Sequence, residues 1–254
     1  MRLWSKGADW LRRIGRAQPA EVPKQITREV DPPPEWDLLR AAERDSIVAS
    51  HVNERLHPLG FVQVKPRRWV DGSAAPVRRV FEMVLLKGAA INPWWGFSLD
   101  FVPHLSGGRL CWHRSNRAAR FDLFFYLDGR KYLDIWGSKY VHFSHGAASL
   151  RRDLERVMPV ALEQAQETWR RGSTLSGILD IVREIRERKI NSFYVFFRWH
   201  LPLTFMFLSA KVGDLAAAQA ELEAYARDQE LDEDVVAKLS KLLQDAASIE
   251  NKEG

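Results

Sequence analysis

The sequence predicts an α+β fold, in which helices pack on an antiparallel sheet of five or six strands and a helical C-terminal subdomain follows. Val77–Val102 (VRRVFEMVLLKGAAINPWWGFSLDFV) reads as two apolar strands joined by a turn around Gly88–Pro93. Asp128-Gly129 lies between two alternating apolar runs, which is the pattern of a β-hairpin. After Gly146 the apolar residues recur at helical spacing. A chain of 254 residues, 46% of them hydrophobic, is long enough to bury a sizeable core.

Residues 1–18 are expected to form a basic amphipathic helix, because apolar side chains share one face and five basic residues occupy most of the rest. Such a helix fits a groove on another protein or, as an alternative, an anionic membrane surface contacted through residues 1–16. It lacks the uninterrupted apolar core of a signal peptide. Residues 19–35, with five prolines, are expected to be an extended linker. The expected contacts with a partner, or with the body of the chain, come from Trp4, Trp10 and Ile14.

Residues 36–171 are expected to form the α+β domain. A helix over residues 36–57 ends before Pro58 and Gly60. Pro66 places the second half of the first strand at a sheet edge or a bulge. The expected strands span residues 61–70, 80–86, 95–102, 109–113, 121–127 and 131–136, and a long helix containing Pro159 spans residues 148–171.

Residues 172–254 are expected to form the helical subdomain, with helices at 175–189, 190–210 and 231–247 among them. Arg198, His200 and Pro202 interrupt the apolar stretch 190–210, so no transmembrane span is expected. Residues 201–228, which contain a Gly213-Asp214 turn, resemble a helical hairpin of the tetratricopeptide type. A solenoid needs several such repeats and no second copy is detectable, so we expect a local hairpin.

The stretch ERLHPLGF after the first helix, followed by a basic strand and a Trp-rich pair of strands, gives residues 36–170 a family resemblance. This region resembles a widespread group of small bacterial α+β domains of unknown function. The resemblance implies an architecture and brings no active site with it. The residues that carry it are Glu54, Leu56, Leu59, Gly60, Phe61, Phe97, Leu99 and Phe101.

The net charge of +5 is unevenly distributed along the chain. Residues 60–145 carry thirteen basic and six acidic side chains (net +7), whereas residues 210–254 carry five and eleven (net −6). A basic sheet region favours an anionic partner or charge-steered docking to a protein, and the alternative is an ordinary solvated surface. The single Cys111 cannot form an intramolecular disulfide and no signal peptide is seen, so we expect a cytoplasmic protein.

Cys111 and three histidines are the candidate metal ligands. Cys111, His113, His142 and His145 would make a Cys-His₃ zinc site if the basic loop expected at residues 105–120 folded over the end of the hairpin. No C-x-x-C is present, so neither a metal nor any other cofactor is expected. Cys111 with His113 as its base would also be a nucleophile, although a buried free cysteine is the commoner arrangement.

Glu82, Asp100 and Asp122 are strand carboxylates that would serve a metal-dependent nuclease if they converged. Each is equally suited to pair with a neighbouring arginine. The sequence contains no glycine-rich phosphate-binding loop and no other specific catalytic motif. A non-enzymatic protein is therefore the expectation.

Arginines interleave with Trp69, Trp94, Trp95 and Trp112 in the sheet region. Arginines contact phosphates and exposed rings stack on bases, so a nucleic-acid-binding protein, including a nuclease, is the alternative function. Trp and Arg also dominate protein interfaces. The predicted function is a non-enzymatic protein-interaction module of the adaptor, immunity or complex-subunit type in a bacterial cytosol. The expected partner contacts here are Trp94 and Trp95, and the expected anion-binding residues are Arg67, Arg68, Arg109, Arg114, Arg117 and Arg120.

Overall fold

The computed structural model describes residues 39–87, 89–107, 109–127, 140–188 and 201–248. The predicted N-terminal helix, the proline linker, the second strand of the Asp-Gly hairpin and residues 190–200 lie outside this range. The contacts expected of Trp4, Trp10 and Ile14 therefore stay predictions.

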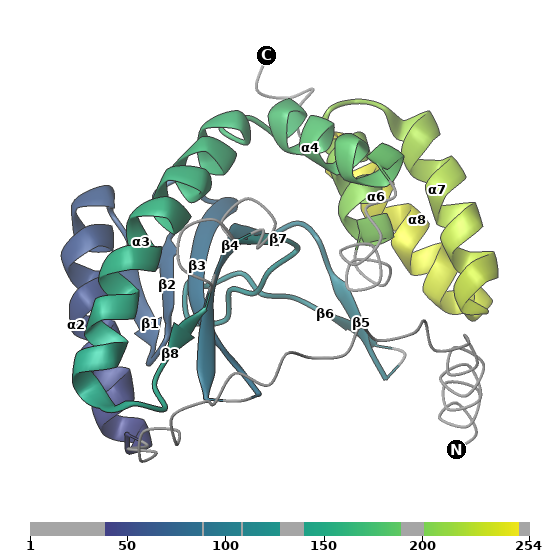
Figure 1. The fold of residues 1–254 in the computed structure, drawn as a ribbon. Coiled ribbons are helices and arrows are strands. Elements are labelled where there is room, and N and C mark those ends of the chain that lie inside the picture. The colour runs from purple at the N-terminus through teal and green to yellow at the C-terminus, as the bar shows by residue number, and fades with distance from the viewer. Residues whose placement is uncertain (1–38, 88, 108, 128–139, 189–200, 249–254) are drawn as a thin grey trace, which may run out of the picture. The chain divides into compact units, whose positions relative to one another are not determined.

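The centre of the fold is a six-stranded sheet in which every pairing is antiparallel (Figure 1). The strand order is β1-β2-β3-β4-β7, and β8 pairs with the first residues of β4. The predicted α+β fold with five or six antiparallel strands is thereby confirmed. The strands are β1 (Val62–Lys65), β2 (Arg68–Asp71), β3 (Val77–Leu86), β4 (Ala90–Leu99), β7 (Leu123–Tyr126) and β8 (Val141–His142).

A tight turn at Pro66 divides the first predicted strand in two. Instead of one strand over residues 61–70, β1 and β2 form an antiparallel hairpin. Proline has no N–H to donate to a strand ladder, which disfavours a continuous strand here. The side-chain amide of Gln63 donates hydrogen bonds to the carbonyl oxygens of Lys65 (3.2 Å) and Pro66 (3.0 Å) and so stabilises the turn.

β3 and β4 pair along their whole length, and the turn between them is shorter than the predicted stretch Gly88–Pro93. Pro93 lies inside β4, opposite Met83. Because Met83 donates its backbone N–H to the carbonyl oxygen of Arg67 (2.8 Å), away from β4, the nitrogen of Pro93 also faces away from this strand pair. On the other edge of β4, the pairings with β8 and β7 lie on either side of Pro93, so no N–H donor is needed there.

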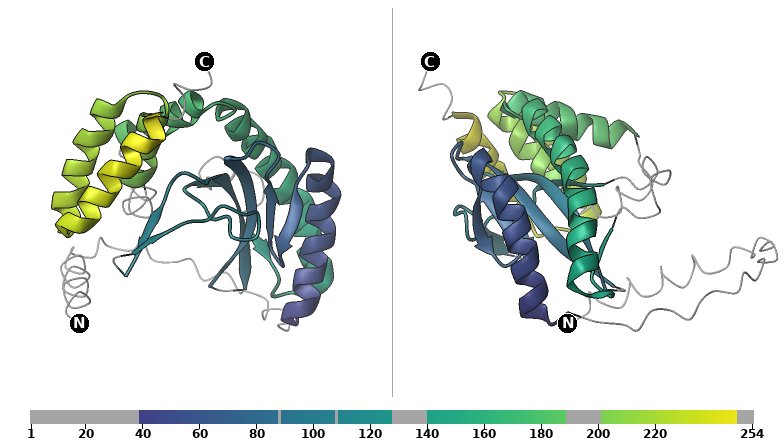
Figure 2. Two further views of the ribbon diagram at one scale, coloured as in Figure 1. Left: turned by 180° about the vertical axis from the view of Figure 1, so that it is seen from behind. Right: turned by 60° about the vertical axis from the view of Figure 1, so that its left-hand side comes forward.

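α2 (Ala41–Leu56), which runs into the short 3₁₀ helix η1 (His57–Leu59), and α3 (Gly146–Arg171) lie side by side against one face of the sheet (Figures 1 and 2). α3 continues through Pro159, whose side chain is exposed. Alternation along the strands turns the large rings toward these helices. We call this side of the sheet the helix face; its buried rings are Trp69, Phe81, Trp95 and Phe97.

Four helices form the predicted helical subdomain: α4 (Leu175–Arg188), α6 (Leu201–Lys211), α7 (Leu215–Gln229) and α8 (Glu233–Ser248). α6 contacts the other three. α6 and α7 make the predicted hairpin: Gly213 adopts a positive φ of +87° in the turn, and the Asp214 carboxylate accepts the Ala217 N–H (3.1 Å) to cap α7. Among the helices described, none is long and apolar enough to cross a membrane.

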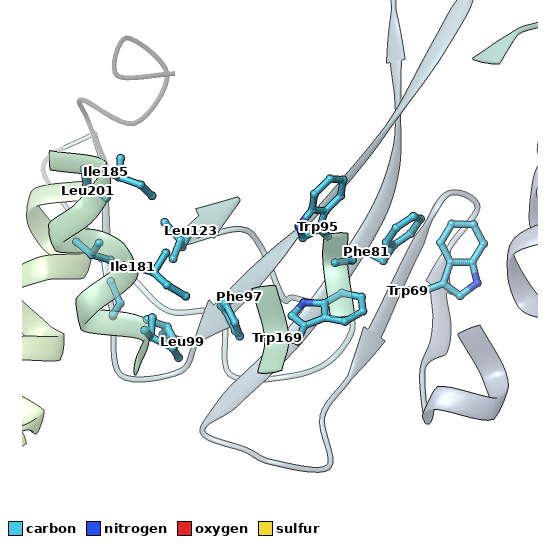
Figure 3. Packing of buried hydrophobic residues seen from close by; sticks show 14 of the residues in the cluster. Trp69, Phe81, Trp95, Phe97, Leu99, Leu123, Trp169, Ile181, Ile185 and Leu201 are labelled. Atoms are coloured by element: carbon cyan, nitrogen blue, oxygen red, sulfur yellow. The ribbon is translucent and has the colours of Figure 1, made fainter. Parts of the chain in front are cut away.

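One hydrophobic core runs from the sheet into the helical subdomain. Figure 3 shows Phe97, Leu99 and Leu123 of the sheet lying between the rings of Trp95 and Trp169 and the aliphatic side chains of α4 and α6. The core therefore continues across the predicted border between residues 171 and 172.

Candidate interaction surface

The strands present a second face on the side away from α2 and α3. Its residues alternate with those of the helix face, so that Arg68 lies opposite Glu82 and Val70 opposite Val80. Val70 and Val80 form a separate apolar cluster with Ala119, and all three are fully buried. Ala119 belongs to the connection that leads into β7. That connection therefore covers part of the second face.

A separate two-stranded hairpin, β5 (His104–Ser106) and β6 (Arg109–Cys111), lies between β4 and β7 in the chain (Figure 1). Leu105 and Leu110 pair across it and pack against the main core. The residues that alternate with them face the other way. Residues 104–120 contain four arginines, two histidines and no Asp or Glu. We call residues 104–120 the basic segment.

Carboxylates neutralise two of the arginines predicted to bind anions. Arg67 donates to both carboxylate oxygens of Asp45 on α2 (2.8 and 2.6 Å), and Arg68 forms an ion pair with Glu82 (2.5 Å). Burial alone would raise the pKa of Asp45, but hydrogen bonds from Arg44 and Arg67 lower it below its usual value. The guanidinium groups of Arg67 and Arg68 are thus each bound to a carboxylate of the protein, and their role in binding an external anion stays a prediction.

Arg78 attaches the basic segment to the sheet. Its side chain is 8% exposed and forms an ion pair with Asp100. Its Nε donates to Oδ1 of Asn116 (2.9 Å) and its Nη2 donates to the carbonyl oxygen of Arg114 (2.9 Å). Burial lowers the pKa of Arg78, and the Asp100 carboxylate compensates the buried charge. The middle of the basic segment is therefore held by a buried cation.

Three arginines of the basic segment remain exposed: Arg109, Arg114 and Arg117. The guanidinium carbon of Arg114 lies 4.1 Å from the centroid of the Trp112 ring, a cation–π contact, and its Nε donates to the carbonyl oxygen of Asp100 (3.2 Å). Arg120 is half-buried. Arg114 is thus an exposed cation in a fixed position beside a tryptophan.

The two tryptophans of β4 lie on opposite faces of the sheet. Trp95 is 2% exposed, and its Nε1 donates to Oγ1 of Thr168 on α3 (3.0 Å). It is a core residue, which corrects the prediction that it contacts a partner. Trp94, on the second face, is half-buried and stacks on Phe124 of β7, with centroids 4.6 Å apart and planes at 4°. The ring of Tyr126 also lies close, at 5.8 Å.

A pair of histidines in the basic segment was not predicted. Nε2 of His113 lies 2.8 Å from Nδ1 of His104, and the rings stack with centroids 4.3 Å apart. At this distance one ring nitrogen donates an N–H and the other accepts it, so the two rings form an N–H···N hydrogen bond. Burial first, and then the positive charges of nearby basic side chains, lowers the pKa of His113. The register of β5 and β6 brings His104 here, and no sequence spacing reports it.

The candidate metal ligands do not converge. Across the described ranges, no group of three or more His, Cys, Asp or Glu side chains is placed to hold a metal ion. Cys111, His113, His142 and His145 all lie within these ranges, so they do not form the Cys-His₃ zinc site. Cys111 is half-buried, and its sulfur lies 4.0 Å from the carbonyl oxygen of Arg109.

The three carboxylates considered for a nuclease are occupied separately. Glu82 pairs with Arg68 and Asp100 pairs with Arg78. Asp122 is 5% exposed, and its Oδ2 accepts the N–H of Leu99 (2.7 Å). Burial raises the pKa of Asp122 to about 7, although this hydrogen bond and the charge of Arg120 lower it. Asp122 is therefore a buried group of the core.

Comparison of the chain with protein-family models, curated proteins and solved structures finds no match. The resemblance to small bacterial α+β domains and to a tetratricopeptide hairpin therefore stays a prediction.

Proposed function

We propose that this protein is a non-enzymatic protein-interaction module of the adaptor, immunity or complex-subunit type, acting in the cytoplasm of a bacterium. The observation that carries the proposal is the stacked pair of Trp112 and Arg114 on the basic segment. Trp and Arg are the residue types that most often dominate the binding energy of protein interfaces. Here the arginine is exposed and already ordered by the ring and by the Asp100 carbonyl.

The placement of the rings favours a protein partner over a nucleic acid. Proteins that bind single strands use exposed aromatic faces on which bases stack. Trp69 and Trp95 are buried, Trp94 stacks on Phe124, and one face of Trp112 is covered by Arg114. The tryptophans that supported the nucleic-acid alternative therefore offer little free ring surface.

The carboxylates support a binding role in the same way. A metal-dependent nuclease needs carboxylates that converge on a cation. Glu82 and Asp100 each neutralise an arginine, and Asp122 is buried against the backbone of β4. These side chains stabilise the second face and the end of the sheet.

Native purification of the tagged chain from its source cells, with nuclease treatment, tests the proposal. We expect a stoichiometric protein band that survives nuclease and is absent from the Trp112→Ala/Arg114→Ala double variant. Arg151→Ala/Arg227→Ala, two exposed arginines on α3 and α7, is the matched control and should keep the band. A nuclease-sensitive absorbance at 260 nm, or a band that the double variant retains, would contradict the proposal.

A second contact is proposed for the N-terminal helix. Its expected apolar face carries Trp10 and Ile14, with Trp4 nearby in the sequence. The Trp10→Asp/Ile14→Asp variant should lose partner binding in the same purification without a lower melting temperature. Unchanged binding in this variant would remove the N-terminal helix from the interface. If the variant instead loses binding to anionic lipid vesicles in a separate sedimentation assay, a membrane surface is favoured.

A further inference from the structure

The basic segment presents exposed positive charge and has no acidic residue in its own sequence. Exposed arginines occur there at positions 109, 114 and 117, and residues 104–120 include no Asp or Glu. Around the rest of the sheet, arginines occur with carboxylates, in the pairs Arg67–Asp45, Arg68–Glu82, Arg78–Asp100 and Arg79–Asp71.

The His113 ring lies in the same positive field. Its pKa is lowered first by burial and then by charges that come from Arg120, Lys65 and Arg68. Arg68 is already paired with Glu82, so the exposed Lys65 is the cation that the β1–β2 hairpin adds beside the basic segment. A surface of this kind attracts carboxylates and speeds encounter with an acidic partner.

The described residues of the basic segment are anchored to the rest of the fold at three places. Leu105 and Leu110 pack against the main core at one end, and Ala119 is buried on the second face at the other. In the middle, Asn116 lies so close to Gly72 that a Cβ there would meet its Oδ1 at 2.3 Å. A surface ordered before binding loses little conformational entropy when a partner docks.

We propose that the basic segment binds an acidic segment of a partner protein, rich in Asp and Glu, through Arg109, Arg114 and Arg117. Guanidinium groups bind carboxylates with two parallel, charge-assisted hydrogen bonds. The stacked Trp112 supplies an apolar neighbour for the partner chain beside Arg114. This proposal rests on the proposed function and adds the chemistry of the partner to it.

The test is a fluorescence-anisotropy titration of the full chain with a labelled peptide rich in Asp and Glu, and with a labelled single-stranded oligonucleotide. We expect the peptide to bind, with an affinity that falls as salt is raised. Arg109→Glu/Arg114→Glu/Arg117→Glu should weaken binding by roughly tenfold or more. The charge-matched control, Arg151→Glu/Arg152→Glu/Arg227→Glu, reverses three exposed arginines elsewhere and should bind as the wild type does.

The corresponding glutamine variant, Arg109→Gln/Arg114→Gln/Arg117→Gln, should also weaken peptide binding and covers the case in which charge reversal disturbs folding. Equal weakening by the control set would overturn the proposal, because net charge and not the basic segment would then decide binding. Tighter binding of the oligonucleotide, with displacement of the peptide, would overturn it in favour of phosphate recognition. A cellular partner that is lost in Trp112→Ala/Arg114→Ala but is not displaced by the peptide would contradict only this inference and leave the proposed function standing.

Discussion

On the helix face of the sheet, β3 and β4 present large apolar side chains such as Phe81 and Trp95, whereas on the second face the same strands carry Arg78, Glu82 and Ser98. The helix face is buried by two helices, so it is stabilised by removing apolar surface from water. The second face is buried partly by the basic segment, which hydrogen bonds and ion pairs hold in place.

The difference between the two faces shows that arginines of the same region have two different roles. Arginines on the strands and their turns are neutralised by carboxylates and order the fold. Residues 104–120 include no acidic residue, and three of their four arginines, Arg109, Arg114 and Arg117, are exposed. Net charge alone does not separate these two sets, but their positions in the structure do.

The largest effect is expected from the neighbouring tryptophans of β4, which have the same size and lie on opposite faces. Trp95→Ala should lower the free energy of unfolding by about 4 kcal/mol, because it empties a site in the core and leaves Thr168 without its indole donor. Trp94→Ala should cost about half as much, since Trp94 is half-buried. Urea denaturation measures both. Equal losses would show that the second face is packed as the helix face is.

The next largest effect distinguishes a buried arginine of the sheet from an exposed arginine of the basic segment. Arg78→Ala should lower the free energy of unfolding by about 3 kcal/mol, because it leaves Asp100 partly buried without its counter-ion. Arg117→Ala should change it by less than about 0.5 kcal/mol, since its side chain is exposed. A stability loss from Arg117→Ala as large as that from Arg78→Ala would mean that the basic segment serves folding and not binding.

The raised pKa of Asp122, which lies where the sheet meets α6, is expected to make the stability of the protein depend on pH. Between the ordinary pKa of 3.8 and about 7, the folded protein holds a proton that the unfolded chain has released, so this residue makes stability fall as pH rises through that range. Above pH 7 the penalty is complete. Asp122→Asn, which keeps an acceptor for the Leu99 N–H, should stabilise the protein at pH 8 by roughly 2 kcal/mol and flatten this dependence. An unchanged pH profile of the melting temperature would contradict the assignment.

The smallest effect concerns His113, whose pKa lies below the ordinary value of 6.5 in the folded protein. As pH falls below 6.5, the unfolded chain takes up a proton that the folded chain resists, so stability falls. His113→Gln should remove this loss while Asp122→Asn does not. Because Asp122 acts in the opposite direction over this range, the measurement is the change in the free energy of unfolding from pH 7 to pH 5.5 in Asp122→Asn and in Asp122→Asn/His113→Gln, and an equal change in both would contradict it.

Much of the fold followed from local patterns, whereas the site depended on contacts between distant residues. Strand alternation puts Trp95, Phe97 and Leu99 on one face, and the structure shows that this face is buried. The pairing of Arg67 with Asp45 depends on the turn that Pro66 makes, and it joins residues 22 positions apart. Patterns in a single sequence do not show which distant residues a turn brings together.

The predicted and observed sites differ for the same reason. The arginines predicted to bind anions included two that form ion pairs within the protein, because the exposure of a side chain cannot be read from its residue type. Likewise, the stacked pair of His104 and His113 depends on how β5 and β6 align. The four arginines of residues 105–120 are visible in the sequence, whereas only the structure shows that three of them are exposed.

The most direct measurement is photocrosslinking in the source cells from a benzoylphenylalanine placed at position 112, compared with the same residue placed at position 151 on α3. The substitution at Trp112 keeps an aromatic ring beside Arg114. The account predicts a nuclease-resistant crosslink to one protein from position 112 and none from position 151. Crosslinks to nucleic acid from position 112, or the same protein adducts from both positions, would contradict the claim that the basic segment is a protein-binding surface.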